Sequence, residues 1–160
     1  MTGEKYDLCI CVEVAEHLQE THAGMFINSL CQYSDVVLFS AAIQLQDGRH
    51  HLNQQWQSYW VDLFDANGCE CLDIVRPAIW ENNEVAWWYR QNIFLFVRRD
   101  SDSAGLINFR HMASPILNIV YPEHYKNKAS LSSNPAMLSC LKCMVFYCRR
   151  LVRKLIGKMQ

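Results

Sequence analysis

Acidic and histidine side chains directly follow the first apolar run of the sequence. Residues 6–12 (YDLCICV) are almost continuously apolar, and Glu13, Glu16 and His17 come next. Such a run is typical of a strand covered on both faces, as in a parallel sheet. The residues after such a strand lie at the sheet edge where open α/β folds bind ligands. The pattern predicts a ligand-facing role for Glu13 and His17; the alternative is a first helical turn whose acids favour the helix dipole.

Two adjacent histidines, His50 and His51, lie in a polar loop after a second apolar run, residues 35–43. Imidazole is the side chain best suited to proton transfer near neutral pH, so His51 is our candidate general base. The alternative is an exposed loop histidine without a chemical role. A zinc site built on E-x-x-E-H is disfavoured because no second histidine lies one helical turn away. We therefore expect no metal site.

Aromatic residues concentrate between residues 56 and 89, where they could form flat surfaces that stack on a sugar or an aromatic substrate. They are Trp56, Tyr59, Trp60, Trp80, Trp87, Trp88 and Tyr89. The four-residue spacing of Trp56 and Trp60 fits core packing equally well. Three arginines could bind a phosphate or a carboxylate through paired hydrogen bonds, or lie on the surface: Arg76, Arg90 and Arg98.

The elements that position these side chains follow from the apolar pattern. We expect strands at residues 6–12, 35–43, 69–79 and 93–99, and helices at residues 13–30 and 54–66. The order β-α-β-α-β-β predicts an α/β layered fold with a mixed sheet. Cys9 and Cys11 share one sheet face, as do Cys69 and Cys71, where thiols are expected to be buried.

Composition and charge divide the chain into a body and a tail. The chain has 160 residues, of which 51% are hydrophobic, and 8 Cys without a secretory signal, which favours a reducing cytoplasm. Residues 1–100 hold 6 Lys/Arg against 14 Asp/Glu, whereas residues 101–160 hold 9 against 2. We expect a domain at residues 1–100, a linker at 101–135 and a basic amphipathic helix at 136–160. That helix would pack on the domain or a partner, or lie on an anionic membrane surface.

The sequence resembles class I S-adenosylmethionine (SAM)-dependent methyltransferases over roughly residues 4–99. Residues 6–18 (YDLCICVEVAEHL) resemble the family's fourth strand and following turn, and residues 35–43 (DVVLFSAAI) its fifth strand. Residues 51–60 (HLNQQWQSYW) resemble the H-L-N-x-x-W-x-x-Y-W stretch of a bacterial and phage subgroup. Residues 87–92 (WWYRQN), with Arg76 and Trp80, are similar to the same subgroup.

The resemblance implies a truncated Rossmann-like sheet, namely strands 4 to 7 of a sheet ordered 3-2-1-4-5-7-6. The C-terminal amphipathic helix, expected from its periodicity, would follow this sheet. The resemblance also implies transfer of a methyl group from SAM to a small molecule or a glycan. His51 would be the catalytic base, and Glu13 and His17 would bind the cofactor. The substrate-binding residues would be His50, Asn53, Trp56 and Tyr59.

The sequence departs from the family in lacking the glycine-rich turn after strand 1 and the acidic residue that ends strand 2. We therefore expect an enzyme that is incomplete without an N-terminal segment; the alternative is a non-catalytic interaction module. Removing strand 1 would also make residues 6–12 a sheet edge, which a second copy or the chain's own tail would cover. The expected partners are an acceptor molecule, a second copy or the missing segment, and a membrane for the tail. Nucleic acid is not expected because the body is acidic. The expected location is cytoplasmic, with membrane association through the tail helix.

Overall fold

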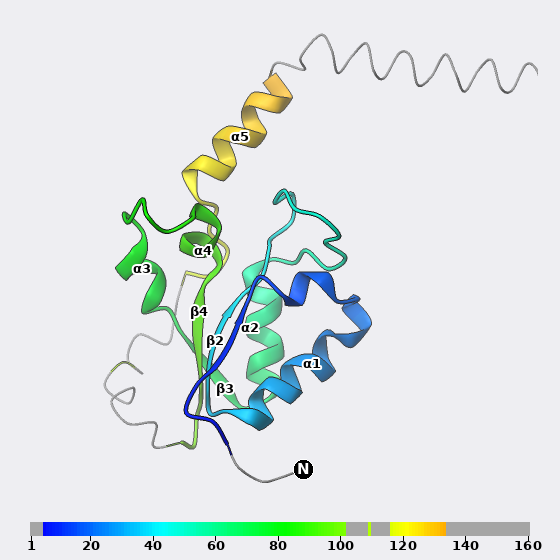
Figure 1. Ribbon diagram of the computed structural model, residues 1–160, viewed down its shortest axis with the longest axis vertical. Helices are drawn as coiled ribbons and strands as arrows, with labels where there is room; N and C mark the ends of the chain where they lie inside the picture. The colour runs from blue at the N-terminus through cyan, green and yellow to red at the C-terminus, as the bar shows by residue number, and fades with distance from the viewer. Residues whose placement is uncertain (1–4, 102–108, 110–115, 134–160) are drawn as a thin grey trace, which may run out of the picture. The chain divides into compact units, whose positions relative to one another are not determined.

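The computed structural model describes residues 5–101, 109 and 116–133, with the side chains of 130–133 left out. The chain divides into two compact units, Met1–Tyr121 and Pro122–Gln160. The first unit has an α/β fold (Figure 1). Its elements in chain order are β1 (Cys9–Val12), a 3-10 helix (Ala15–His17), α1 (Glu20–Tyr33), β2 (Val36–Ser40), α2 (Gln57–Ala66), β3 (Cys69–Leu72), α3 (Val75–Ile79), α4 (Trp87–Asn92) and β4 (Phe94–Arg98).

The four strands form one open, mixed sheet in the order β1-β2-β4-β3. Strands β1 and β2 are parallel, and β4 is antiparallel to both of its neighbours, β2 and β3. The predicted α/β class with a mixed sheet is therefore confirmed. Helices α1 and α2 cover one face of the sheet, and α3 and α4 lie on the other side (Figure 1).

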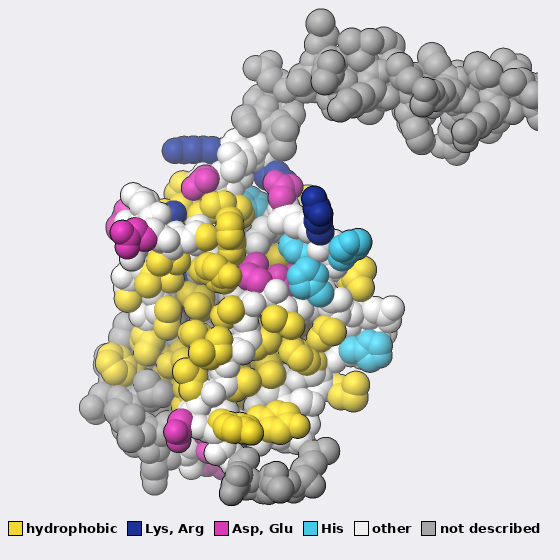
Figure 2. All heavy atoms as spheres, in the orientation of Figure 1, with side chains coloured by type: hydrophobic (Ala, Val, Ile, Leu, Met, Phe, Trp, Pro, Cys, Tyr) yellow, Lys and Arg dark blue, Asp and Glu magenta, His cyan; other side chains and the backbone are white. Residues whose placement is uncertain are grey.

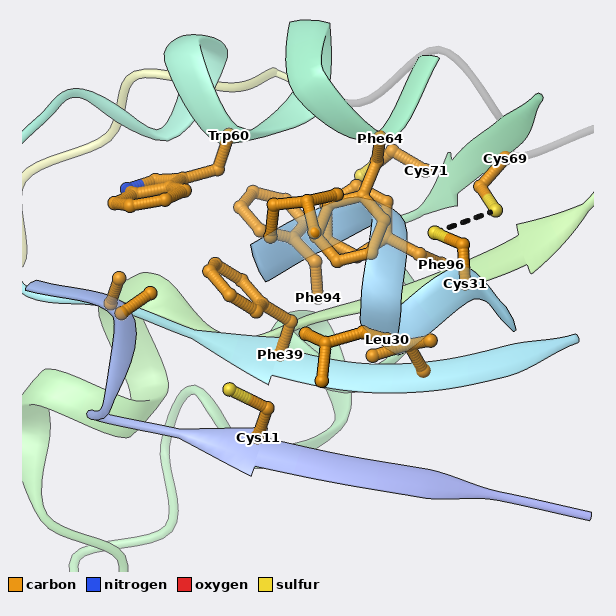
Figure 3. Packing of buried hydrophobic residues seen from close by; sticks show 14 of the residues in the cluster. Cys11, Leu30, Cys31, Phe39, Trp60, Phe64, Cys69, Cys71, Phe94 and Phe96 are labelled. Carbon is orange, nitrogen blue, oxygen red and sulfur yellow. Dashed lines mark hydrogen bonds between the residues drawn. The ribbon is translucent and has the colours of Figure 1, made fainter. Parts of the chain in front are cut away.

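Aromatic rings fill the layer between the sheet and helix α2 (Figure 3). Phe64 of α2 stacks on Phe96 of β4, with ring centroids 3.7 Å apart, and Phe39 of β2 meets the Phe64 ring edge-on at 5.2 Å. Alternate residues of each strand point into this layer, as the two-residue period of a strand requires. The prediction of buried thiols is confirmed for Cys11, Cys69 and Cys71, whereas Cys9 is only partly buried.

The second face of the sheet becomes progressively less covered towards β1. Leu72, Leu95, Leu38 and Ile10 are paired in register across the four strands. Leu72 is 0% exposed and packs near α3, Leu95 is 9% exposed, and Ile10 is 62% exposed. Within the described residues β1 pairs only with β2, so it is an edge strand with an exposed apolar side chain. The sheet edge expected at residues 6–12 is therefore present, with an apolar side chain exposed on it.

Two boundaries, the end of β3 and the start of α1, differ from the predictions. The strand expected at residues 69–79 ends at Leu72, and α3 follows from Val75. Pro77 cannot donate a ladder hydrogen bond but fits the first turn of a helix. The helix expected from Glu13 begins at Glu20, because Glu13 has a left-handed backbone (φ 52°) and a 3-10 helix intervenes. Helix α4 was not predicted.

Residues 116 and 117, which follow β4 in the chain, are held in the first unit by the side chain of Arg76 in α3. This side chain is 1% exposed and donates hydrogen bonds to the carbonyl oxygens of Ile116 (2.7 Å) and Leu117 (3.1 Å). It also donates to both carboxylate oxygens of Asp73, at 2.8 and 2.5 Å. Arg76, like the buried Arg90, is therefore part of the structural interior and not a surface residue.

The second unit begins with helix α5 (Pro122–Ser133), which lies inside the segment expected to be a linker. The basic amphipathic helix expected at residues 136–160 lies outside the described residues. Among the helices that are described, none combines the length and the apolar character needed to cross a bilayer.

Candidate functional site

The candidate site lies where the parallel strands β1 and β2 end. Because the strands run in the same direction, the residues after Val12 and after Ser40 meet at one edge of the sheet. The first segment, residues 13–17, contains the 3-10 helix, and the second, residues 41–56, is the long loop that leads to α2. Figure 2 shows histidine side chains gathered at this end of the molecule, beside acidic side chains.

Glu13 is the best-anchored acid of the site. One carboxylate oxygen accepts a hydrogen bond from the Ser40 hydroxyl (2.9 Å) and the other from the Gln46 amide (3.1 Å). Burial and the neighbouring Glu16 charge raise the pKa of Glu13 to about 7, although hydrogen bonds from Ser40, Asn92 and Gln46 oppose that shift. Glu13 therefore changes charge near neutral pH.

Glu16 is in a different situation, since its side chain is 0% exposed and neither carboxylate oxygen has a hydrogen-bond partner of good geometry. Burial raises its pKa, and the nearby amides of Glu16 itself and of Ala42 only partly oppose this. The backbone of Glu16 is well anchored: its carbonyl oxygen accepts hydrogen bonds from the amides of Leu52 (2.8 Å) and Asn53 (3.0 Å). These two bonds hold the loop after β2 against the 3-10 helix.

The rings of His17 and His51 meet edge-to-face beside Glu16, with centroids 5.0 Å apart. Nδ1 of His17 lies 3.2 Å from the carbonyl oxygen of His50, to which it donates a hydrogen bond. Nδ1 of His51 lies 2.7 Å from the side-chain nitrogen of Gln54. Burial and the neighbouring His17 lower the pKa of His51, against the opposing effect of Glu13. A neutral imidazole is thus favoured at His51, as a proton acceptor requires.

The His51 ring lies directly over Gly48. A Cβ atom at Gly48 would be 2.0 Å from Cε1 and 2.2 Å from Nε2 of His51, so only glycine leaves room for the ring in this position. The sequence motif D-G-R-H-H thus encodes both the loop and the space that the ring occupies.

The chain matches no family model, no curated protein and no solved structure. What the site can do must therefore be derived from its own groups. It combines two carboxyl groups with raised pKa values, a neutral imidazole and an exposed imidazole. Such a set can accept a proton from a hydroxyl or an amine, or bind a cation.

The remaining predicted site residues lie further along the same loop and on α2. His50 is exposed, with a left-handed backbone (φ 59°), and Asn53 is buried, its side-chain oxygen accepting a hydrogen bond from Gln55 (2.9 Å). Trp56 is partly exposed at the N-terminal cap of α2. Tyr59 packs on the hydrophobic core. The structure therefore brings Glu13, His17 and His51 together, whereas Tyr59 contributes to packing.

The sequence did not indicate an amide network behind Glu13. Oε1 of Gln46 accepts a hydrogen bond from Asn92 (2.8 Å), the neighbouring Gln91 donates to Asn92 (2.9 Å), and the Gln46 amide in turn binds Glu13. Gln91 and Asn92 end helix α4 and are buried. The only sequence signal is that two amides follow an aromatic run, where a solvated surface would carry charges.

Proposed function

We propose that the first unit is the second half of a class I SAM-dependent methyltransferase domain, transferring a methyl group to a small molecule or a glycan. The observation that carries the proposal is the sheet order. In the family order 3-2-1-4-5-7-6, strands 4 to 7 are arranged 4-5-7-6, and the order β1-β2-β4-β3 corresponds to this arrangement strand by strand. The parallel pair β1 and β2 would be strands 4 and 5.

The position of the polar cluster supports the same proposal. Open α/β sheets bind ligands beyond the carboxyl ends of their parallel strands, and Glu13, His17 and His51 lie beyond the ends of β1 and β2. In the proposed enzyme, Glu13 and His17 face SAM, and neutral His51 removes a proton from the acceptor as the methyl group moves. Strands 1 to 3 of the family fold would supply the glycine-rich turn and the ribose-binding carboxylate.

The second candidate function is a non-catalytic interaction module, and the exposed edge β1 favours it. An apolar edge with Ile10 exposed offers unpaired backbone groups to another strand. A methyltransferase half and an interaction module differ in whether SAM contacts the cluster beyond β1.

SAM binding can be tested by following backbone amide signals in NMR spectra of the purified chain during a SAM titration. We expect very weak binding or none, with a dissociation constant above about 10 μM, or less than roughly 7 kcal/mol of binding free energy, because the glycine-rich turn and the ribose-binding carboxylate are missing. The shifts should be confined to residues 13–17 and 46–54 and should be lost in Glu13→Gln. The control is Glu20→Gln, which changes an exposed acid in the first turn of α1. A dissociation constant of about 10 μM or tighter, or shifts mainly outside these residues, would contradict the proposal.

Catalysis is tested after adding strands 1 to 3 from a methyltransferase of the same subgroup. His51→Ala should then lower methyl transfer by about 100-fold or more if His51 is a positioned base. The exposed His22 provides the control, since His22→Ala should leave the rate unchanged. Equal turnover of parent and His51→Ala would remove His51 from the catalytic group.

A further inference from the structure

One carboxylate and two imidazoles converge beyond β1 although they come from two separate segments. Glu16 and His17 belong to the 3-10 helix, and His51 belongs to the loop after β2. One potential ligand atom from each of the three residues lies within 4.8 Å of the others. We propose that Glu16, His17 and His51 form a binding site for a divalent first-row transition metal ion such as Zn²⁺. This inference does not rest on the proposed function and competes with it, because an imidazole bound to a metal at His51 could not also act as the base.

The Glu16 carboxylate is the strongest argument for a cation. It is completely buried, and neither of its oxygens has a hydrogen-bond partner of good geometry, although the amides of Glu16 and Ala42 and the Glu13 carboxyl group lie nearby. Both oxygens of Glu13, in contrast, are hydrogen-bonded. A buried carboxylate without partners is costly, and such groups in folded proteins call for an explanation, a bound ion among them. A metal ion would supply the missing partner to Glu16.

The geometry of His17 is also that of a metal ligand. Its Nδ1 donates to the His50 carbonyl oxygen, which leaves the lone pair of Nε2 free. Metal-binding histidines usually have their second nitrogen held by a carbonyl or a carboxylate in this way. This carbonyl belongs to His50, the residue before His51. The loop after β2 therefore both orients the His17 imidazole and carries the His51 imidazole.

The three candidate ligand atoms need to move only slightly closer together to bind one metal ion. Ligands about 2.1 Å from a tetrahedral metal ion lie about 3.4 Å from one another, so distances of up to 4.8 Å must close by about 1.4 Å at most. Side-chain rotation can provide this, while the backbone stays fixed by the hydrogen bonds from Leu52 and Asn53 to the Glu16 carbonyl oxygen.

The donor set indicates the class of metal. Two imidazoles and a carboxylate suit Zn²⁺ and its first-row neighbours, while Mg²⁺ and Ca²⁺ prefer oxygen ligands. Three protein ligands with a water in the fourth position are also the arrangement of catalytic zinc sites. The exposed position of His17 leaves that side of the site open to water.

Gln54 is expected to limit the affinity of the site for a metal ion, so a substitution at this position can test whether the affinity can be raised. Its amide nitrogen donates to the carbonyl oxygen of Gln46 (2.5 Å) and contacts Nδ1 of His51 (2.7 Å), which favours a proton on Nε2. For Nε2 to bind the metal, the proton must reside on Nδ1 and the amide or the ring must rotate. A carboxylate in place of this amide would accept the Nδ1 proton and orient His51 as a ligand.

The experiment uses the full chain, treated with a chelator and then titrated with Co²⁺ and Zn²⁺ without SAM. Binding is followed by cobalt absorption and by calorimetry. We expect one ion per chain, and a loss of affinity of more than about 100-fold in Glu16→Gln and in His17→Ala/His51→Ala, beyond the usual effect of an outer-shell partner. His22→Ala, which removes an exposed histidine outside the cluster, should bind as the parent does.

Two further variants keep the test informative if a ligand variant fails to fold. Gly48→Ala should weaken binding, because the three atoms nearest to its added Cβ all belong to the His51 ring, which it would displace. Gln54→Glu should strengthen binding about 10-fold. The proposal is overturned if the folded parent binds neither ion. It is also overturned if the cobalt complex shows a thiolate charge-transfer band that the double histidine variant retains, since cysteines would then hold the metal.

Discussion

Replacing Arg76 with methionine should destabilise the first unit strongly. Arg76 is almost completely buried, and its guanidinium group contacts Asp73, the backbone carbonyls of residues 116 and 117, and the face of the Phe94 ring at 4.0 Å. Methionine has a similar unbranched stem and retains apolar packing on Phe94. The substitution therefore removes mainly the charge and its hydrogen bonds.

The size of the effect follows from what is left behind. Breaking a buried ion pair by removing one partner costs about 3 to 5 kcal/mol, because the other charge stays buried without compensation. Asp73 retains 14% of its side-chain exposure, so some solvation remains and the lower end of that range applies. We expect the free energy of unfolding to fall by about 3 kcal/mol.

Urea unfolding followed by tryptophan fluorescence measures this loss. The matched control is Arg99→Met, which removes an exposed ion pair with Asp65 and should cost less than about 1 kcal/mol. Arg76→Met/Asp73→Asn should recover part of the loss because no uncompensated carboxylate remains. A loss below about 1 kcal/mol in Arg76→Met would show that the residues after β4 do not depend on this side chain, and would refute the reasoning.

Two further predictions concern the end of the sheet opposite the site and its exposed edge. Asp35 is partly buried, which raises its pKa, but hydrogen bonds from Lys5 and Arg98 lower that pKa below its usual value. Its stabilising contribution is therefore present above the unfolded pKa of about 4 and lost as the pH falls through the lower folded value. The difference in unfolding free energy between the parent and Asp35→Asn should shrink on acidification; pH-independent differences would contradict this. Ile10→Lys should dissociate a dimer paired through β1 or destabilise the fold, as measured by sedimentation and hydrogen exchange. A stable parent monomer whose residues 6–12 exchange their amide hydrogens rapidly would contradict the expectation that another strand or the tail covers this edge.

The sequence predicted the strands better than the site, for a physical reason. Apolar runs such as residues 6–12 and 35–43 are dictated by burial in the sheet, and β1 and β2 lie within them. Helix α4 is only six residues long, and its aromatic run carries no helical periodicity. The end of β3 had a local signal, Pro77, which cannot donate a ladder hydrogen bond, whereas the burial of Arg76 had none.

The contact between His17 and His51 depends on the path of a long loop. Two backbone hydrogen bonds to the Glu16 carbonyl oxygen set that path, and backbone bonds between distant segments leave no trace in residue type. The rule that places a second histidine one helical turn away therefore missed a partner 34 residues further along the chain. The burial of Glu16 was missed for a related reason, because an acid in a first helical turn is ordinarily solvated.

The thiols of Cys31 and Cys69 make it possible to measure chemically how often helix α1 separates from the sheet. Their sulfur atoms lie 3.5 Å apart, one at the end of α1 and the other at the start of β3 (Figure 3). The hydrogen bond between the two thiols lowers the pKa of Cys69, so the thiolate that alkylating reagents attack forms more readily there. Both thiols are buried, so a reagent reaches them only when α1 separates from the sheet. The rate of Cys69 alkylation then measures how often this separation occurs in the native protein.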